Sequence, residues 1–174
     1  MSDKRITKRI KKYSVNYTIA IIAVIFCLIL TSCGKEYIGK AKMDGVSMEP
    51  TILEGQELIF LSLDGIPKNG DLILINHKTG YQKPLVKRVI AIQGQYLNID
   101  FDNNEVYVDG VKLDEPYTQG VTVRGDIPDE EINIVIPEGK VFVLGDNRRV
   151  SLDSRHEIVG LIDIEDIGGI IELP

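Results

Sequence analysis

An uncharged, apolar run near the N-terminus constrains this chain of 174 residues more than any other feature. The run covers residues 13–34 and is bounded by Lys12 and Lys35. As an α-helix its 22 residues would span about 33 Å, enough to cross the hydrocarbon core of a bilayer, which is about 30 Å thick. A core helix in a small domain usually keeps a polar face, and this run has none. The sequence therefore predicts a transmembrane helix over residues 13–34.

Basic residues precede this run and indicate its orientation. Six Lys and Arg side chains lie within residues 1–12, where Asp3 is the only acid. Lys and Arg near the ends of a membrane helix stay on the cytoplasmic side. We therefore expect a single-pass protein of the cell membrane, with residues 1–12 in the cytoplasm, residues 35–174 outside, and membrane lipid as a partner.

The end of the apolar run allows a second interpretation. Small residues precede Cys33 in the stretch Leu30–Cys33, and this pattern resembles the processing site of a bacterial lipoprotein. In that case the chain would be cut before Cys33 and the cysteine would be lipidated. Both interpretations leave the rest of the chain tethered at the outer surface.

The rest of the chain is acidic and contains no cysteine. Residues 34–174 carry 14 basic and 25 acidic side chains, a net charge of −11, which would repel the phosphates of a nucleic acid. Both cysteines, Cys27 and Cys33, lie in the apolar run, so this part has no disulfide and no thiolate site for a metal. With His77 and His156 as the only histidines, a zinc site is not expected either. The sequence thus predicts no nucleic-acid partner, no metal and no cofactor.

From residue 40 onward the apolar pattern indicates β-structure. Short runs rich in β-branched residues alternate with Gly, Pro, Asn and Asp, and no helical period extends over ten residues. The clearest runs are Glu57–Ser62, Asp71–Asn76, Leu85–Ile92 and Lys140–Leu144. Tyr96–Phe101 and Glu105–Val108 flank a pair of asparagines and are predicted to form a hairpin. We predict a mainly β body, in which Asp114–Glu138 is a surface excursion and about 94–138 form a small inserted subdomain.

Two side chains of this body could act together in catalysis. Ser47 lies in the predicted turn Asp44–Thr51, where a serine can also be a plain turn former. Lys87 lies in an apolar strand, and because adjacent strand residues point to opposite faces, we expect Lys87 and Arg88 to separate, one inward and one outward. A lysine that points inward loses solvation, so its pKa falls from about 10.4. A neutral amine beside a serine hydroxyl is a competent general base, whereas an outward Lys87 would be an ordinary surface charge.

A polar loop follows the strand that ends near residue 144. The segment Gly145–Arg155 contains two acids, three arginines and two serines. Such a composition favours a loop that is held by charge-assisted hydrogen bonds.

Together these segments resemble the type I signal peptidases of the Gram-positive kind, which are serine proteases with a Ser/Lys dyad. The motifs that carry the resemblance occur in the order of the family, between about residue 37 and about residue 171. They are the nucleophile motif Ser47–Thr51, the second box Gly70–Ile73, the lysine motif Lys87–Ala91 followed by Gly94, the last box Gly145–Arg155, and the connectors Leu113–Tyr117 and Val135–Gly139.

The resemblance implies a membrane-bound serine endopeptidase that removes signal peptides from exported preproteins through an acyl-enzyme. Its catalytic domain would be an antiparallel β domain over residues 35–174. Ser47 would attack the scissile carbonyl, and neutral Lys87 would accept its proton. The Ser47 backbone N–H would donate to the oxyanion, while Gly45 stands where some relatives carry a second donor hydroxyl.

The same resemblance gives roles to further residues. Ser151 would orient the lysine amine, and the residues that would support the site are Asp146, Asn147, Arg148, Asp153 and Arg155, the last two as an ion pair. Shallow apolar pockets would accept the small residues before the cleavage site of an extended substrate that adds to a sheet edge. The residues expected to line these pockets are Met48, Ile52, Leu85 and Val86, for which plain core packing is the alternative.

Three other interpretations fit the sequence less well. A Ser-His-Asp triad could use His77 or His156, which lie at a strand end and beside a charged loop. A self-cleaving repressor would need a DNA-binding domain where this chain has an apolar run. A non-catalytic β lipoprotein that binds a surface partner would explain Leu30–Cys33 but neither Lys87 nor the loop Gly145–Arg155.

Overall fold

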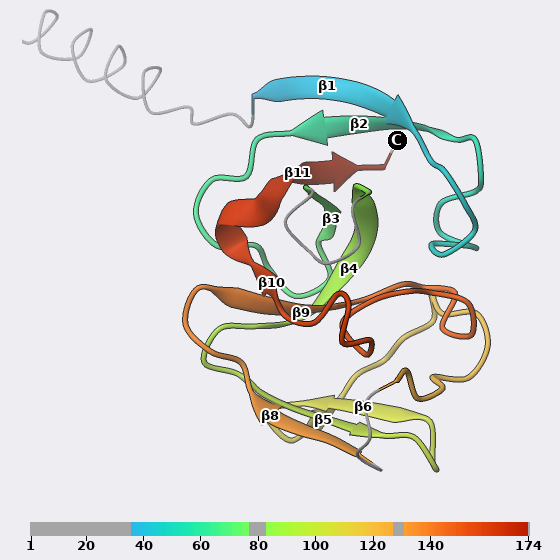
Figure 1. Cartoon of the computed structure of the whole chain (residues 1–174), viewed down its shortest axis with the longest axis vertical. Helices are drawn as coiled ribbons and strands as arrows, with labels where there is room; N and C mark the ends of the chain where they lie inside the picture. The colour runs from blue at the N-terminus through green and yellow to red at the C-terminus, as the bar shows by residue number, and fades with distance from the viewer. Residues whose placement is uncertain (1–35, 77–82, 127–130, 174) are drawn as a thin grey trace, which may run out of the picture. The chain divides into compact units, whose positions relative to one another are not determined.

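The computed structural model describes residues 36–76, 83–126 and 131–173 (Figure 1). The predicted transmembrane helix, the basic N-terminal segment and His77 lie outside these residues. Among the residues that are described, no helix is both long enough and apolar enough to cross a membrane.

The regular secondary structure of the described residues is almost only antiparallel β-strand, which confirms the predicted fold class for this part of the chain. The strands are β1 (Tyr37–Lys42), β2 (Glu57–Leu61), β3 (Leu72–Ile75), β4 (Leu85–Ile92), β5 (Tyr96–Asp100), β6 (Glu105–Val108), β7 (Val111–Lys112), β8 (Glu131–Val135), β9 (Lys140–Leu144), β10 (Ile162–Asp163) and β11 (Ile167–Glu172). A short 3₁₀ turn, η1 (Ile164–Asp166), joins the last two. The predicted hairpin is present as β5 and β6, with Asn104 in its turn at a φ of 57°.

Seven strands form the larger sheet, in the order β1-β2-β11-β3-β4-β9-β10. The C-terminal strand β11 lies between β2 and β3, so it pairs with two strands that are far from it in the sequence. β4 is the longest strand and pairs with β3 on one side and β9 on the other. The central strands are apolar along most of their length because both faces of the sheet are covered.

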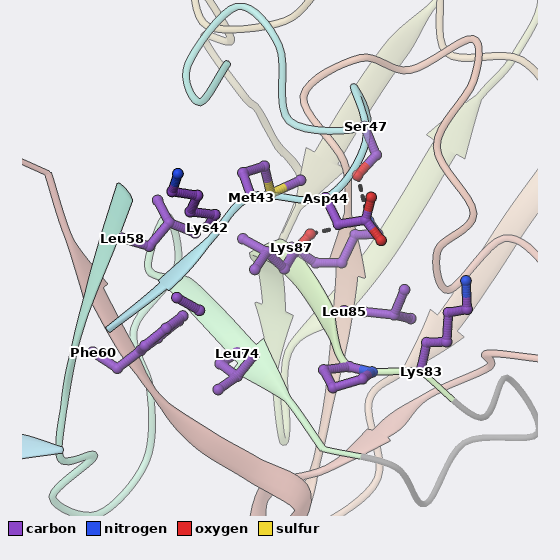
Figure 2. Close-up of a pocket in the computed structure, with 13 residues that line it drawn as sticks. Lys42, Met43, Asp44, Ser47, Leu58, Phe60, Leu74, Lys83, Leu85 and Lys87 are labelled. Carbon is purple, nitrogen blue, oxygen red and sulfur yellow. Dashed lines mark hydrogen bonds between the residues drawn. The ribbon is translucent and has the colours of Figure 1, made fainter. Parts of the chain in front are cut away.

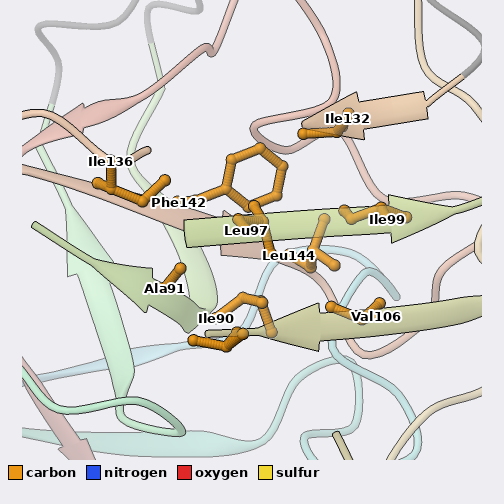
Figure 3. Packing of buried hydrophobic residues seen from close by; sticks show 10 residues of the cluster. Ile90, Ala91, Leu97, Ile99, Val106, Ile132, Ile136, Phe142 and Leu144 are labelled. Atoms are coloured by element: carbon orange, nitrogen blue, oxygen red, sulfur yellow. The ribbon is translucent and has the colours of Figure 1, made fainter. Parts of the chain in front are cut away.

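The smaller sheet has the order β7-β6-β5-β8 and packs against β4 and β9 of the larger one (Figure 3). Ile90 and Phe142 of the larger sheet share one buried cluster with Leu97, Ile99 and Ile132 of the smaller sheet. Residues of the predicted subdomain therefore bury their apolar face on the rest of the body and do not have a separate core. That 94–138 form a unit of their own stays a prediction.

Another buried cluster holds the turn between β1 and β2. Met48 and Ile52 are fully buried there against Leu58, Phe60 and other apolar side chains of β2, β3 and β11. Burying two large side chains of a short turn stabilises it by roughly 3 to 6 kcal/mol in transfer free energy. This anchoring fixes the position of Ser47, which directly precedes Met48.

Candidate active site

Ser47 is presented by the anchored turn that follows β1. Gly45 has a φ of 89°, a backbone conformation that a residue with a Cβ rarely adopts, so the turn needs glycine at this position. Met48 lies directly after the serine and is buried, and its carbonyl accepts a hydrogen bond of 2.9 Å from the Ile52 N–H. As a result the Ser47 side chain is half-buried and points toward β4 (Figure 2).

Lys87 lies on β4 and meets this serine. Its side chain is 2% exposed, and its Nζ donates to the Ser47 Oγ at 2.8 Å and to the Val86 carbonyl at 3.0 Å (Figure 2). The structure thus brings together the two residues that the sequence predicts as the dyad, from positions forty residues apart.

Burial lowers the pKa of Lys87 from its ordinary value of 10.5 to about 8, even though the nearby Asp153 and Asp146 carboxylates raise it. The cause is desolvation, since the ammonium form loses its hydration inside the protein. At pH 7 about one tenth of such lysines would be neutral, compared with roughly one in three thousand for a fully hydrated lysine. The site can therefore supply a free amine at neutral pH.

Arg88 corrects one sequence prediction. We expected one residue of the Lys87–Arg88 pair to point outward, yet Arg88 is only 9% exposed. Alternation does send the two side chains to opposite faces, but β4 lies inside the protein and both faces are covered. Arg88 Nε and Nη2 donate to the two carboxylate oxygens of Asp146 at 2.8 and 2.6 Å, and its guanidinium stacks over the Tyr117 ring at 3.9 Å.

The loop after β9 passes beside the dyad. The Asn147 N–H donates to the Ser47 carbonyl at 3.0 Å, and its Nδ2 donates to the Val46 carbonyl at 3.2 Å. Gly145 lies so close to the turn that a Cβ there would be 2.5 Å from the Ser47 carbonyl oxygen and 2.2 Å from the Ser151 Oγ. Glycine at this position is therefore a condition for the contact between the loop and the turn.

Ser151 is buried beside Gly145 without the contact expected for it. The sequence places Ser151 near the lysine amine, but within the described part of the chain its Oγ makes no well-formed hydrogen bond to any group. The hydroxyl lies near the Asp153 carboxylate and contributes to that group's low pKa. Ser151 is thus next to the site, and orientation of the Lys87 amine by its hydroxyl is not seen.

A buried ion pair holds this loop from inside. Arg155 Nε and Nη2 donate to the Asp153 carboxylate at 2.8 and 2.9 Å, and Asp153 Oδ2 accepts the Gly145 N–H at 3.0 Å. Burial alone would raise the pKa of Asp153, but the hydrogen bonds and charge of Arg155 hold it below its ordinary value. The predicted Asp153–Arg155 pair is therefore present, in contact with the residue that lies against Ser47.

Arg148 joins the loop to the excursion that precedes β8. Its guanidinium donates to both Glu115 oxygens at 3.2 and 2.6 Å and to the Thr122 hydroxyl at 2.9 Å, while its Nε donates to the Gly145 carbonyl at 3.0 Å. Glu115 and Thr122 are partners that sequence reasoning missed. The need of a buried arginine for an acid was the one available signal, and it does not say which acid.

Thr51 was also missed, because it contacts a residue far away in the sequence. Its hydroxyl donates to Asp146 Oδ2, so the carboxylate that binds Arg88 also ties the end of the nucleophile turn. Asp146 therefore connects the turn, β4 and the loop through one side chain.

A pocket of about 330 Å³ opens beside the dyad (Figure 2). Leu85 and Val86 line it, as the sequence predicts, together with residues of β1 and β2. Met48 and Ile52 do not line it, since both are fully buried in the core. These two residues pack in the core, which is the alternative that the sequence left open for them.

The histidine and metal alternatives gain no support. The His156 ring lies 4.0 Å from Asp153 and makes no contact with Ser47 among the described interactions. Within residues 36–76, 83–126 and 131–173, no group of three or more His, Cys, Asp and Glu side chains is arranged to hold a metal.

The fold and site are those of an antiparallel β protein in which a buried lysine amine contacts a serine hydroxyl. The family model "Signal peptidase, peptidase S26" matches residues 13–174, so the chain belongs to this family of serine peptidases and is a hydrolase. This confirms the resemblance seen in the sequence motifs.

Individual relatives agree with this assignment. Signal peptidase IB of Staphylococcus aureus is 36% identical over 165 residues, which are 85% of this chain and 82% of that protein. Signal peptidase I of Bacillus licheniformis is 34% identical over 86% of this chain and 81% of its own length. Signal peptidase I P of Bacillus subtilis subsp. natto is 32% identical over 99% and 94%.

One solved structure is also similar. It is a signal peptidase I from Enterococcus faecalis, with a TM-score of 0.48 and 24% identity over 64% of this chain and all of that one. This likeness is loose, so the family assignment rests on the sequence matches.

Proposed function

We propose that this chain removes signal peptides from exported preproteins, with Ser47 as nucleophile and Lys87 as general base. The observation that carries the proposal is the 2.8 Å contact between the Ser47 Oγ and the Nζ of a lysine that is 2% exposed. Membership in the signal peptidase family supports the substrate class.

The mechanism follows from the hydrogen-bonding capacity of a neutral amine. Neutral Lys87 has one lone pair and two N–H bonds, so it can accept the Ser47 O–H while it donates to the Val86 carbonyl. Ser47 Oγ then attacks the scissile carbonyl as its proton moves to Nζ, and Nζ returns a proton to the leaving amine. In the second half water attacks the acyl-enzyme carbonyl as Lys87 takes its proton. Lys87 then returns that proton to the Ser47 Oγ as the ester bond breaks and the new C-terminus is released.

The turn also offers a donor for the oxyanion. Among the described residues the Ser47 N–H has no hydrogen-bond acceptor, whereas the Ser47 carbonyl is engaged by Asn147. An N–H that is free and fixed beside the nucleophile can stabilise the charge of the tetrahedral intermediate. Gly45 supplies no hydroxyl, so a second donor is not expected from that position.

Two unpaired strand edges suggest how the substrate binds. In β4 the pairing with β9 begins at Arg88, so Leu85 and Val86 have no partner strand on that side among the described residues. Within residues 36–76, 83–126 and 131–173, β1 pairs with β2 alone, and its last residues line the opposite wall of the pocket. We propose that an extended peptide enters between these edges and pairs with backbone groups, with its small side chains directed into the pocket.

The membrane topology is proposed from the sequence. Residues 13–34 would cross the membrane, residues 1–12 would stay in the cytoplasm, and residues 35–174 would lie outside as the peptidase domain. An outer position suits an enzyme that meets a signal peptide at the membrane surface.

The test uses the purified full chain in detergent with a preprotein substrate. Ser47→Ala and Lys87→Ala should each abolish cleavage, while Lys68→Ala, which changes an exposed lysine outside the pocket, should retain it. Thermal unfolding of all three variants shows whether they stay folded. Full cleavage by a folded Ser47→Ala or Lys87→Ala variant would refute the dyad.

A further inference from the structure

Besides Lys87, two lysines lie on the walls of the pocket. Lys42 is the last residue of β1 and Lys83 lies two residues before β4, and they lie on opposite sides of the close-up in Figure 2. Both side chains are exposed, and within the described part of the chain neither ammonium pairs with a carboxylate. Two positive charges are therefore available to whatever occupies this pocket.

These charges stand out against the rest of the body. Residues 34–174 have a net charge of −11, so a basic rim is unlike the general surface. The floor of the pocket is apolar and includes Leu58, Phe60 and Leu85. Its one carboxylate belongs to Asp44, three residues before the nucleophile. The pocket thus has an acid close to Ser47 on the chain and two lysines on its rim.

The position of Lys83 along β4 gives the distance from the reacting bond. Leu85 and Lys87 are alternate residues of β4 and share one of its faces, and Lys83 lies at a bend two residues before the strand. Four residues of strand cover about 13 Å. Pro84 favours an extended backbone between Lys83 and the strand. If the scissile bond of an extended peptide lies at Ser47, the peptide residue that reaches Lys83 is about four positions away from that bond.

We infer that this pocket selects preproteins with an acidic side chain at the fourth or fifth residue before the cleaved bond. The inference rests on the proposed function, in which the signal-peptide side of the substrate occupies the pocket. A Glu or Asp there meets Lys83 and Lys42, whereas an acid directly beside the cleaved bond meets Asp44. The preference therefore depends on position as well as on charge.

The experiment compares matched preproteins that carry Glu, Gln or Lys at these positions. The full chain is assayed in an uncharged detergent, where no lipid phosphate can compete for the lysines. We expect kcat/KM to be about two- to five-fold higher for the Glu substrate than for the Lys substrate, with Gln between them, as is usual for partly exposed charge pairs. The difference should fade at about 0.5 M salt because the pairs are screened.

Charge reversal in the enzyme provides the decisive comparison. Lys83→Glu should invert the order of the substrates and Lys42→Glu should weaken the preference. Lys68→Glu makes the same change in net charge at an exposed site outside the pocket and should leave the preference intact.

Equal cleavage of the Glu and Lys substrates by the unmodified enzyme would overturn this inference but not the proposed function. A Lys68→Glu variant that shifts the preference as much as Lys83→Glu would also overturn it, since the effect would come from net charge. A preference that arises only with anionic vesicles would overturn it as well, because Lys42 and Lys83 would then bind lipid and not the substrate. Failure to cleave any of the substrates would overturn the proposed function and the inference together.

Discussion

Replacing Lys87 with methionine should make the protein more stable at pH 7 while it abolishes activity. The amine is fully buried, and its pKa is lowered from 10.5 to about 8 because the charged form is desolvated. At 1.36 kcal/mol per pKa unit this shift corresponds to about 3 kcal/mol of folding free energy. Methionine has a similar length and no charge, so it fills the same space without that cost.

The sign of the effect follows from proton binding. Between pH 8 and pH 10.5 the unfolded chain holds a proton on Lys87 that the folded chain has released, so the native enzyme gains stability as pH rises through this window. Below pH 8 the cost is fully present. Loss of the hydrogen bonds to Ser47 and the Val86 carbonyl opposes the gain by about 1 kcal/mol. The Lys87→Met variant should therefore exceed the native enzyme by about 2 kcal/mol at pH 7 and lose this advantage near pH 10.5.

Urea unfolding of both proteins in the same detergent, at pH 7, 8, 9 and 10.5, measures this difference. Lys68→Met, at an exposed lysine, is the matched control and should show no pH-dependent gain. A Lys87→Met variant that is less stable at pH 7, or a difference that does not change with pH, would show that Lys87 is not desolvated as the structure indicates.

Three further predictions concern activity. The kcat/KM of the native enzyme should rise about ten-fold per pH unit below pH 7 and level off above a midpoint near 8, as the Lys87 amine loses its proton; a flat profile from pH 6 to 9 would contradict this. Gly145→Ala should lower kcat about a hundred-fold, because the new Cβ would displace the Ser47 carbonyl. The control Gly39→Ala places a Cβ where no atom lies within 4 Å and should keep its kcat; equal kcat values in the two variants would count against the contact between Gly145 and Ser47. Asp146→Asn should lower the free energy of unfolding by about 3 kcal/mol in a urea titration, because Arg88 stays buried without its partner. It should also move the midpoint of the pH profile down, because a charge that raises the pKa of Lys87 is lost; an unchanged midpoint in folded protein would refute this second expectation.

The β-strands of the body could be predicted because their signal is local. The runs at β2, β3, β4 and β9 match the expected segments to within a residue, since β-branched residues and turn residues mark them directly. The insertion of β11 between β2 and β3 could not be predicted, because nothing in Ile167–Glu172 specifies its neighbours. It depends on which faces remain uncovered after the other strands have paired.

The same difference separates the two halves of the candidate site. Ser47 and Lys87 lie in segments with recognisable motifs, so the pair could be predicted before its geometry was known. The contacts of Arg148 with Glu115 and Thr122 join residues 33 and 26 positions apart and depend on the path of the excursion. The burial of Arg88 could not be predicted either, because alternation gives the face of a residue but not what covers that face.

The register of the larger sheet explains why the polar loop lies beside the lysine. Arg88 is paired with Leu144, the last residue of β9, so the chain that leaves the strand passes Lys87 at Gly145. Three ion pairs hold this loop in its place. They are Asp146 with Arg88, Asp153 with Arg155, and Glu115 with Arg148.

The charges of Asp153 and Asp146 raise the pKa of Lys87 and the charge of Arg155 lowers it, so these charges partly offset one another at the amine. Burial is therefore left as the largest influence on the pKa of Lys87, and the carboxylates raise it less than desolvation lowers it. Arg155 thus supports the proposed chemistry from outside the pocket, since its charge offsets part of the effect of acids that lie near a base that must be neutral.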